Sequence, residues 1–298
     1  MKIDALSLAI AATCFALPAS AQDAAGSDPG EIVVEGERLA EADAVRGLVQ
    51  RLADAHGPDM PATRYFDALC VSVTGLNPTG NSLIRERIVE NAVAVGLEVQ
   101  PEGCRVNALV VVWDEPGAVV SRIKDEQPGL LPSEVRTAVD AAVARRDPLI
   151  VWHNEENRNQ GGRRVPHSSD IVGASGSGSA LNVQARVNTH GRPSRTSLSH
   201  SRGVVSAAII IDADSVVGME TDRLADYATM RLLAPDLVPL RDGASSPSSV
   251  TAPFPQNGGA QLLSRFDRAY LTALYGLRPN APAIQLARAV AEEFESGD

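Results

Sequence analysis

The stretch that decides the fold runs from Val204 to Ala234 and reads VVSAAIIIDADSVVGMETDRLADYATMRLLA. Its first part, Val204–Ile211, is a short and almost continuous apolar run, which predicts a buried strand. After a polar turn, apolar residues recur at helical spacing and predict an amphipathic helix. In the core we expect Ile209–Ile211 to lie under one face of that helix, formed by Leu224, Tyr227 and Met230.

The first 21 residues have the pattern of an export signal. Lys2 precedes the apolar run Ala5–Leu17, and Ala19-Ser20-Ala21 matches a cleavage site. We expect residues 22–60 to be a mobile N-terminal segment, apart from a short helix at Glu41–Ala55. No later apolar run reaches membrane-spanning length, so the pattern predicts a periplasmic or secreted protein.

A strand, a helix and a second strand are predicted before the central stretch. Asp67–Leu76 and Cys104–Trp113 have the composition of strands, and apolar residues at helical spacing lie between them. Parallel neighbouring strands would bring Cys70 and Cys104 close together. In an exported chain we therefore expect a disulfide between them, with two buried free thiols as the alternative.

These patterns predict an α+β protein, with a small β-α-β unit plus a mixed sheet that contains the buried strand–helix pair. Residues 61–298 would form a single domain, interrupted by a flexible, Ser- and Gly-containing insert near 154–180. The other predicted elements are strands at Pro148–His153 and Leu181–Val187 and helices at Ala118–Glu126, Ser133–Arg145, Leu262–Leu274 and Pro282–Phe294.

Composition and motifs limit the possible chemistry. The formal net charge of −10 and the aromatic content of 4% make nucleic acid a poor partner. The chain contains no H-E-x-x-H, no G-x-S-x-G and no P-loop motif, so we expect no metal and no cofactor. The remaining catalytic candidates are His153, Glu155 and His200, whose alternative is to be ordinary polar residues at loop edges.

Asp226 and Tyr227, in the middle of the predicted helix, are interpreted as structural residues. Asp226 lies too far into the helix to cap its first turn, where acidic residues offset the helix dipole. We expect its carboxylate to face the C-terminal helices and to pair with Arg265 or Arg268.

One segment of the N-terminal region suggests a partner. Glu31–Leu39, EIVVEGERL, resembles the TonB box of outer-membrane receptors, in which an extended strand is lent to a periplasmic protein. The alternative is an edge strand or a linker. The resemblance implies that an envelope protein binds this segment.

Several segments resemble an uncharacterised family of exported alphaproteobacterial proteins, over most of Tyr65–Phe294. The resemblance implies no activity and no site residue. The segments that carry it are Phe66–Val73 with Cys104–Val112, Leu149–His153, Asp222–Leu233 and Phe266–Tyr275.

More distantly, the order of strand, helix, long loop and Leu-Tyr-containing helix is similar to zincin-like domains of unknown function. In zincins the helix carries H-E-x-x-H, whose histidines bind zinc and whose glutamate activates water. The corresponding helix here has the sequence Leu224-Ala225-Asp226-Tyr227-Ala228. The resemblance therefore implies a peptidase-like shell without the metal motif, a pseudoenzyme.

Two functions follow from the sequence. The first is a non-catalytic binding or cell-envelope accessory protein, because no catalytic motif is recognised. The second is a periplasmic hydrolase with a site near His153 and His200.

Overall fold

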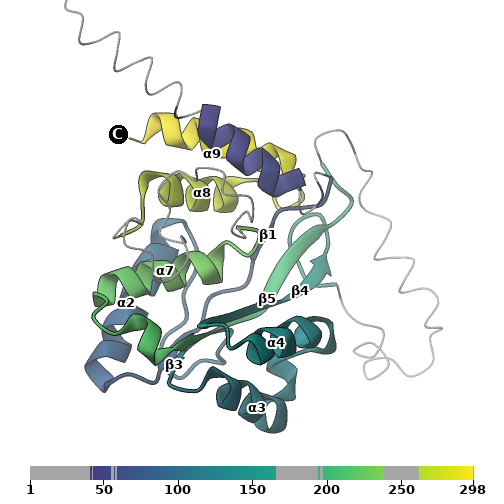
Figure 1. Cartoon of the computed structure of the whole chain (residues 1–298). Helices are drawn as coiled ribbons and strands as arrows, with labels where there is room; N and C mark the ends of the chain where they lie inside the picture. Colours follow the sequence, from purple (N-terminus) through teal and green to yellow (C-terminus); the bar gives the residue numbers. More distant parts are fainter. Residues whose placement is uncertain are drawn as a thin grey trace, which may run out of the picture.

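Strand β5 (Ser201–Asp212) is the central strand of a five-stranded sheet, as its apolar run predicts. The computed structural model describes residues 41, 43–54, 57, 59–165, 194, 197–237 and 262–297. Helices cover both faces of the sheet (Figure 1). The predicted α+β class with a mixed sheet is confirmed.

The two edges of β5 have different neighbours. Along one edge, β4 (Leu149–Arg158) runs antiparallel over nearly the whole strand. The other edge is shared by two short parallel strands: β1 (Thr63–Tyr65) pairs with residues 202–204, and β3 (Ala108–Trp113) pairs with residues 207–212. Strand β2 (Val71–Thr74) lies outside β3 and is parallel to it.

A β-bulge interrupts β5 between its two short neighbours. In the pairing with β4, Asn154 lies opposite Ser206 and Glu155 lies opposite Val204, which leaves Val205 as the extra residue. A bulge changes which face of the sheet the following side chains occupy. Val204 and Ala207 therefore belong to the same core cluster although they are three residues apart.

Asn107 joins the strands at this interruption. Its carbonyl oxygen accepts a hydrogen bond from the Ala207 amide at 2.9 Å and from the Tyr65 hydroxyl at 3.0 Å. Its side chain accepts from the Cys70 amide at 2.7 Å and donates to the Ala68 carbonyl at 3.0 Å. Through its carbonyl and its side chain together, this residue before β3 connects the end of β1 and the start of β2 with β5.

The predicted β-α-β unit and its disulfide are both present. Helix α2 (Pro78–Ala94) begins at Asn77, whose side chain accepts the Gly80 amide at 2.8 Å, and ends before Gly96 at φ 82°. This N-cap and this left-handed glycine are the usual start and stop signals of a helix. Cys70 and Cys104 form a disulfide with their Cα atoms 6.0 Å apart.

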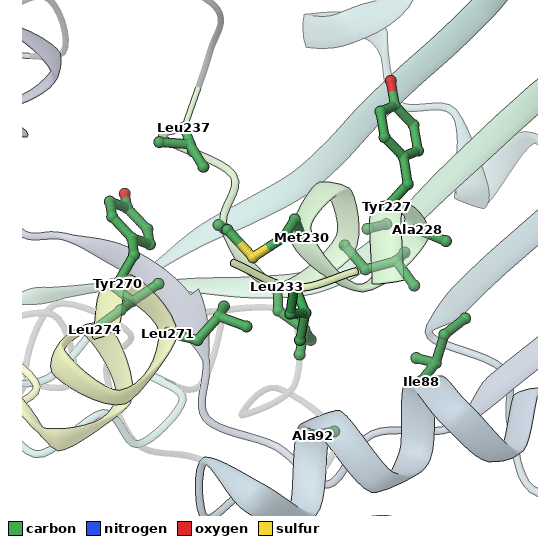
Figure 2. Close-up of a cluster of buried hydrophobic side chains, with 14 of the residues drawn as sticks. Ile88, Ala92, Tyr227, Ala228, Met230, Leu233, Leu237, Tyr270, Leu271 and Leu274 are labelled. Atoms are coloured by element: carbon green, nitrogen blue, oxygen red, sulfur yellow. The ribbon is translucent and has the colours of Figure 1, made fainter. Parts of the chain in front are cut away.

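One face of the sheet carries most of the core. Helix α7 (Thr221–Leu233) lies between α2 and α8 (Arg265–Gly276), and Figure 2 shows Met230 and Leu233 among side chains from both. Leu224, Tyr227 and Met230 are buried, as predicted. Helix α9 (Ile284–Ser296) packs outside α8 (Figure 1).

The start of α8 is fixed by a capping box. The Ser264 hydroxyl accepts the Asp267 amide at 3.1 Å, and the Asp267 carboxylate accepts the Ser264 amide at 2.9 Å. Such reciprocal bonds satisfy two amides that a helix leaves unpaired. The helix therefore begins at Arg265, three residues after the predicted start.

The opposite face carries a smaller core. Helices α3 (Pro116–Glu126) and α4 (Ser133–Arg145), joined by the 3₁₀ turn η1 (Pro128–Leu130), cover it (Figure 1). Its buried side chains are Val111, Val120, Ile123, Leu131, Val139, Ala142, Ile150, Trp152, Ala208 and Ile210.

The short helix predicted at Glu41–Ala55 is present, but two predicted boundaries need correction. Residues 43–54 form this helix, which packs near α9 (Figure 1), with Val45, Leu48, Val49 and Leu52 buried in the main core. This spacing is that of an amphipathic helix, so the ordered domain begins well before residue 61. Strand β4 continues to Arg158, past the predicted start of the insert, because β5 pairs with it throughout.

Several predictions concern residues outside the described ranges. These are the signal segment 1–21, the strand-lending segment Glu31–Leu39, the strand Leu181–Val187 and most of the insert. None of the helices in the described part of the chain has the length and apolar character that a bilayer crossing requires.

Candidate functional site

A cleft of about 1160 Å³ opens where the bulge interrupts the sheet. We call it the bulge cleft. Its lining comes from the sheet, from the segment before β3 and from the η1–α4 region: Asp67, Ala68, Gln100, Arg105, Val106, Asn107, Gly129, Leu130, Pro132, Glu134, Val135, His153, Asn154, Glu155, Glu156, Arg164, Arg202, Val205 and Ser206.

The position of Asn154 in the cleft is fixed by two hydrogen bonds from its amide nitrogen. Nδ2 donates to the Leu130 carbonyl at 3.1 Å and to the Ser206 hydroxyl oxygen at 2.7 Å. The Leu130 carbonyl also accepts from the Trp152 indole at 2.7 Å. Because a carbonyl can only accept, these contacts determine which end of the Asn154 amide is nitrogen.

The oxygen of the same amide has no partner. Asn154 is only 9% exposed, and its Oδ1 receives no hydrogen bond in the structure. A buried acceptor without a donor costs about 1–3 kcal/mol, so such atoms are rare in folded proteins. This orphaned acceptor belongs to a residue that lines the bulge cleft.

A network of charges borders the cleft at the end of β4. Buried Arg158 donates to both carboxylate oxygens of Asp67, at 3.0 and 2.7 Å. Arg164 donates to Asp67 at 2.9 Å and lies 3.1 Å from Glu156. The hydrogen bond from Arg158 is the main reason why the pKa of Asp67 is lowered. These contacts hold residues 158–164 against the end of β1.

The cleft carries charges of both signs, and most of them are paired. Glu155 forms an ion pair with Arg202, and Glu156 contacts Arg158 and Arg164. Arg105 has no carboxylate partner among the described residues, which leaves one cation in the lining for a ligand. The charged lining residues are Asp67, Glu134, Glu155, Glu156, Arg105, Arg164 and Arg202.

His153 lines the cleft, but its ring is bonded to the helix above the sheet. Nε2 lies 2.9 Å from the Arg231 carbonyl of α7, which can only accept, so Nε2 carries a proton. Burial of the ring lowers the pKa of His153 to about 4. The imidazole is therefore neutral at pH 7 and connects β4 to α7.

The structure separates the three candidate catalytic residues. His153 lies opposite Ala207 and Glu155 lies opposite Val204, and both line the cleft. His200 is seven residues before Ala207, on the order of 20 Å along the strand, and does not line the cleft.

Ser206, the hydroxyl residue of the cleft, is not paired with His153. Ser206 lies opposite Asn154, and neighbouring residues on a strand point to opposite faces. The Ser206 hydroxyl accepts its hydrogen bond from Asn154 at 2.7 Å. The described residues thus contain no Ser–His pair in the cleft.

Asp226 is fully buried, but the predicted pairing with Arg265 or Arg268 is wrong. Its carboxylate accepts from Arg87 at 2.9 and 3.2 Å, from Asn91 at 2.7 Å and from the Leu263 amide at 2.9 Å. Burial alone would raise its pKa, yet these bonds lower it. Its carboxylate therefore faces α2, which supplies Arg87 and Asn91, and also reaches the backbone just before α8.

Tyr227, beside it, is also buried. Its hydroxyl accepts from Arg231 at 3.2 Å, and the Arg231 guanidinium lies 5.2 Å from the ring centroid. Burial is the main reason why the pKa of Tyr227 is raised. Both residues hold α7 in place, at a distance from the bulge cleft that excludes them from its lining.

Comparisons with known proteins give no further guide to the site. The chain matches no family model, and neither a curated protein nor a solved structure matches it significantly. The described residues contain no group of three His, Cys, Asp or Glu side chains that could hold a metal ion. The resemblances to the exported family and to zincins stay predictions.

Sequence reasoning did not identify Asn154, Arg158 or Ser206. Asn154 and Arg158 lie in a polar run, NEENRNQGG, at the start of the predicted flexible insert. The one available signal was the alternation of buried residues in β4, which continues from Ile150 and Trp152 to Asn154. In a run of polar residues, the alternation of buried and exposed positions is not visible in the sequence, because no apolar residues mark the buried positions.

Proposed function

We propose that the protein is a non-catalytic binding protein of the cell envelope, and that it holds a small polar ligand in the bulge cleft. The observation that carries the proposal is the cleft itself: about 1160 Å³ of space with a polar and charged lining. Small-molecule sites commonly occupy about 300–1,000 Å³ and place a few polar groups in fixed positions.

The location in the envelope is supported by two features. The signal pattern at the N-terminus predicts export. The disulfide between Cys70 and Cys104 is a bond that persists in oxidising compartments. It joins the segments that precede β2 and β3, and the second of these contributes Arg105 to the cleft.

The arrangement of the lining favours binding over catalysis. General bases need a pKa near the working pH and a free nitrogen or oxygen close to the reacting proton. His153 has a pKa of about 4 and uses Nε2 for the Arg231 carbonyl. Its partner in a nucleophilic pair would be Ser206, which points to the other face.

The proposal is tested with the exported, oxidised protein. Its melting temperature is measured with separate pools of amino acids, short peptides, sugars and nucleotides, each at 1 mM. A ligand at about 100 times its Kd stabilises the folded state by about 2.7 kcal/mol, which raises the melting temperature by several degrees. If no pool raises it, the protein is not a binding protein for these ligands.

A matched pair of variants connects the shift to the cleft. Arg105→Ala removes the unpaired cation, whereas Arg288→Ala removes an exposed arginine on α9 that does not line the cleft. We expect the first change to reduce the shift and the second to leave it unchanged. Equal effects of both changes would place the ligand elsewhere.

Hydrolase activity is the second candidate, because His153 and Glu155 line the same cleft. The ligand found above is incubated with the protein and its products are analysed. In His153→Gln, the glutamine amide can still donate to the Arg231 carbonyl, so the fold should be kept. Turnover by the wild type that this variant abolishes would establish the hydrolase; an unchanged ligand supports the binding protein.

A further inference from the structure

We propose that the bulge cleft recognises the backbone of a short extended peptide, through Asn154 and Ser206. This inference rests on the proposed binding function and names its ligand class. Its starting point is the buried Oδ1 of Asn154, which lacks a donor and belongs to a residue that lines the cleft. The contacts of the neighbouring atoms indicate which chemical group would donate a hydrogen bond to this oxygen.

Asn154 cannot satisfy its oxygen by turning the amide over. The nitrogen end donates to the Leu130 carbonyl at 3.1 Å, and a flipped amide would place oxygen against oxygen there. The Trp152 indole, which donates to the same carbonyl at 2.7 Å, keeps η1 close to β4. Oδ1 therefore remains an acceptor that needs an N–H or O–H group from outside.

Ser206 supplies the complementary donor. Its hydroxyl oxygen accepts from Asn154 at 2.7 Å, and we find no acceptor for its proton among the described residues. A hydroxyl carries one donor and two acceptor positions, so this proton is available to a ligand. Residues directly opposite each other in an antiparallel pair have Cβ atoms about 4.5–5.5 Å apart.

An acceptor and a donor side by side match the backbone of an extended peptide. One residue of such a peptide offers its N–H donor and its C=O acceptor on the same side of the chain, so the N–H fits Asn154 Oδ1 and the C=O fits the Ser206 hydroxyl. Arg105, the cation without a carboxylate partner in the described lining, suits the terminal carboxylate of a short peptide.

The rest of the lining argues against flat ring ligands. Nucleobases bind proteins largely by stacking on aromatic side chains. No Trp, Tyr or Phe is among the described residues that line the cleft. The bulge adds to the openness of the site, because Val205 is left unpaired by β4 and is only partly buried.

The first experiment uses a positional-scanning library of tetrapeptides with free ends, at 1 mM, and the melting temperature of the oxidised protein. We expect at least one pool to raise it, and the Kd of its best peptide is then measured by calorimetry. If no peptide pool raises it, the inference fails. A response to sugars alone would overturn it while keeping the binding function; no response to any class would remove both.

The second experiment identifies the atoms. Each peptide N–H of the best tetrapeptide is replaced in turn by an ester oxygen, which removes one donor. We expect one ester to bind wild-type protein at least tenfold more weakly, and Asn154→Leu to bind that ester and the parent peptide equally. Discrimination that persists in Asn154→Leu would show that Asn154 does not accept the N–H.

Two further variants guard against a folding artefact. Ile150→Val removes a methyl group from the buried core of the same strand but does not line the cleft, so it should bind the peptide with unchanged affinity. Ser206→Ala keeps the Asn154 oxygen and should weaken the parent peptide about fivefold. If Asn154→Leu does not fold, this weakening decides the matter, and an unchanged Kd in Ser206→Ala overturns the inference.

Discussion

The two halves of strand β5 are built in different ways. Its second half, residues 207–212, lies between β3 and β4, and Ile209, Ile210 and Ile211 are completely buried. Its first half, residues 201–206, lies between β1 and β4 and contains the bulge, Gly203 and Ser206. One half has aliphatic neighbours on both faces, and the other has a charged network and a cleft.

The difference shows where this fold can carry a site. Burial of apolar surface is non-directional, so the second half is held by the volume of its side chains. The first half is held by directional contacts, such as those of Arg202 with Glu155 and of Ser206 with Asn154. Directional polar groups can be left open to a ligand without weakening the main core.

The strongest test of this contrast removes side chains from each half. Ile209→Ala should lower the free energy of unfolding by about 3 kcal/mol, because it leaves a cavity in the core. Val205→Ala, at the partly exposed bulge, should cost less than about 1 kcal/mol. Urea unfolding of the two variants measures both values, and equal losses would contradict the contrast.

A second test concerns the close approach of Arg158 to β5. A Cβ atom on Gly203 would lie 2.3 Å from Nε and 2.7 Å from Cδ of this buried side chain. Gly203→Ala should therefore displace Arg158 and cost about 2 kcal/mol.

The control for this test is Gly276→Ala at the end of α8, where no heavy atom lies within 4 Å of the added Cβ. It should change the free energy of unfolding by less than about 0.5 kcal/mol, measured in the same urea series. A neutral Gly203→Ala would mean that Arg158 is not held in place.

The smallest expected effect is a pH dependence of the free energy of unfolding. It comes from His153, which lies opposite Ala207 at the border of the two halves of β5. Its pKa is about 4 in the folded protein and near the ordinary 6.5 in the unfolded chain. Between these values only the unfolded chain binds the proton, so stability falls as the pH falls from about 6.5 to 4. From pH 7.5 to 6 the loss is under about 1 kcal/mol.

Urea unfolding of the wild type and of His153→Gln at these two pH values measures this effect. The wild type should lose more stability than the variant, because the variant has no imidazole to protonate at this position. An identical loss in both proteins would assign the pH dependence to other groups.

The parts predicted from the sequence are those with an apolar pattern. Ile209–Ile211 belong to a continuous apolar run, and the helix from Thr221 and the apolar face of α2 repeat at the helical period. The two cysteines follow from the β-α-β unit. The bounds of α4, Ser133–Arg145, agree with the prediction. In each case hydrophobic burial acts locally, so neighbouring residues carry the information.

The candidate site could not be predicted in the same way. Arg158 is buried because Asp67, ninety-one residues earlier, accepts its hydrogen bonds, and nothing near Arg158 indicates this. The bulge lies between the parts of β5 that pair with β1 and with β3, and three-residue β1 has too short a pattern to detect. Of the three candidate catalytic residues, His153 and Glu155 reach the cleft, but His200 does not.

Strand β1 also sets the order in which the chain can fold. Its sheet partner lies at residues 202–204, and the Thr63 amide donates to Asp236 at 2.9 Å. Just before it, the Met60 carbonyl accepts the Ala283 amide at 2.8 Å. A growing polypeptide therefore keeps β1 without all of these partners until residue 283 has been synthesised. Among the described strands, the first to be synthesised is thus one of the last to gain all its partners, because they come from segments far along the chain.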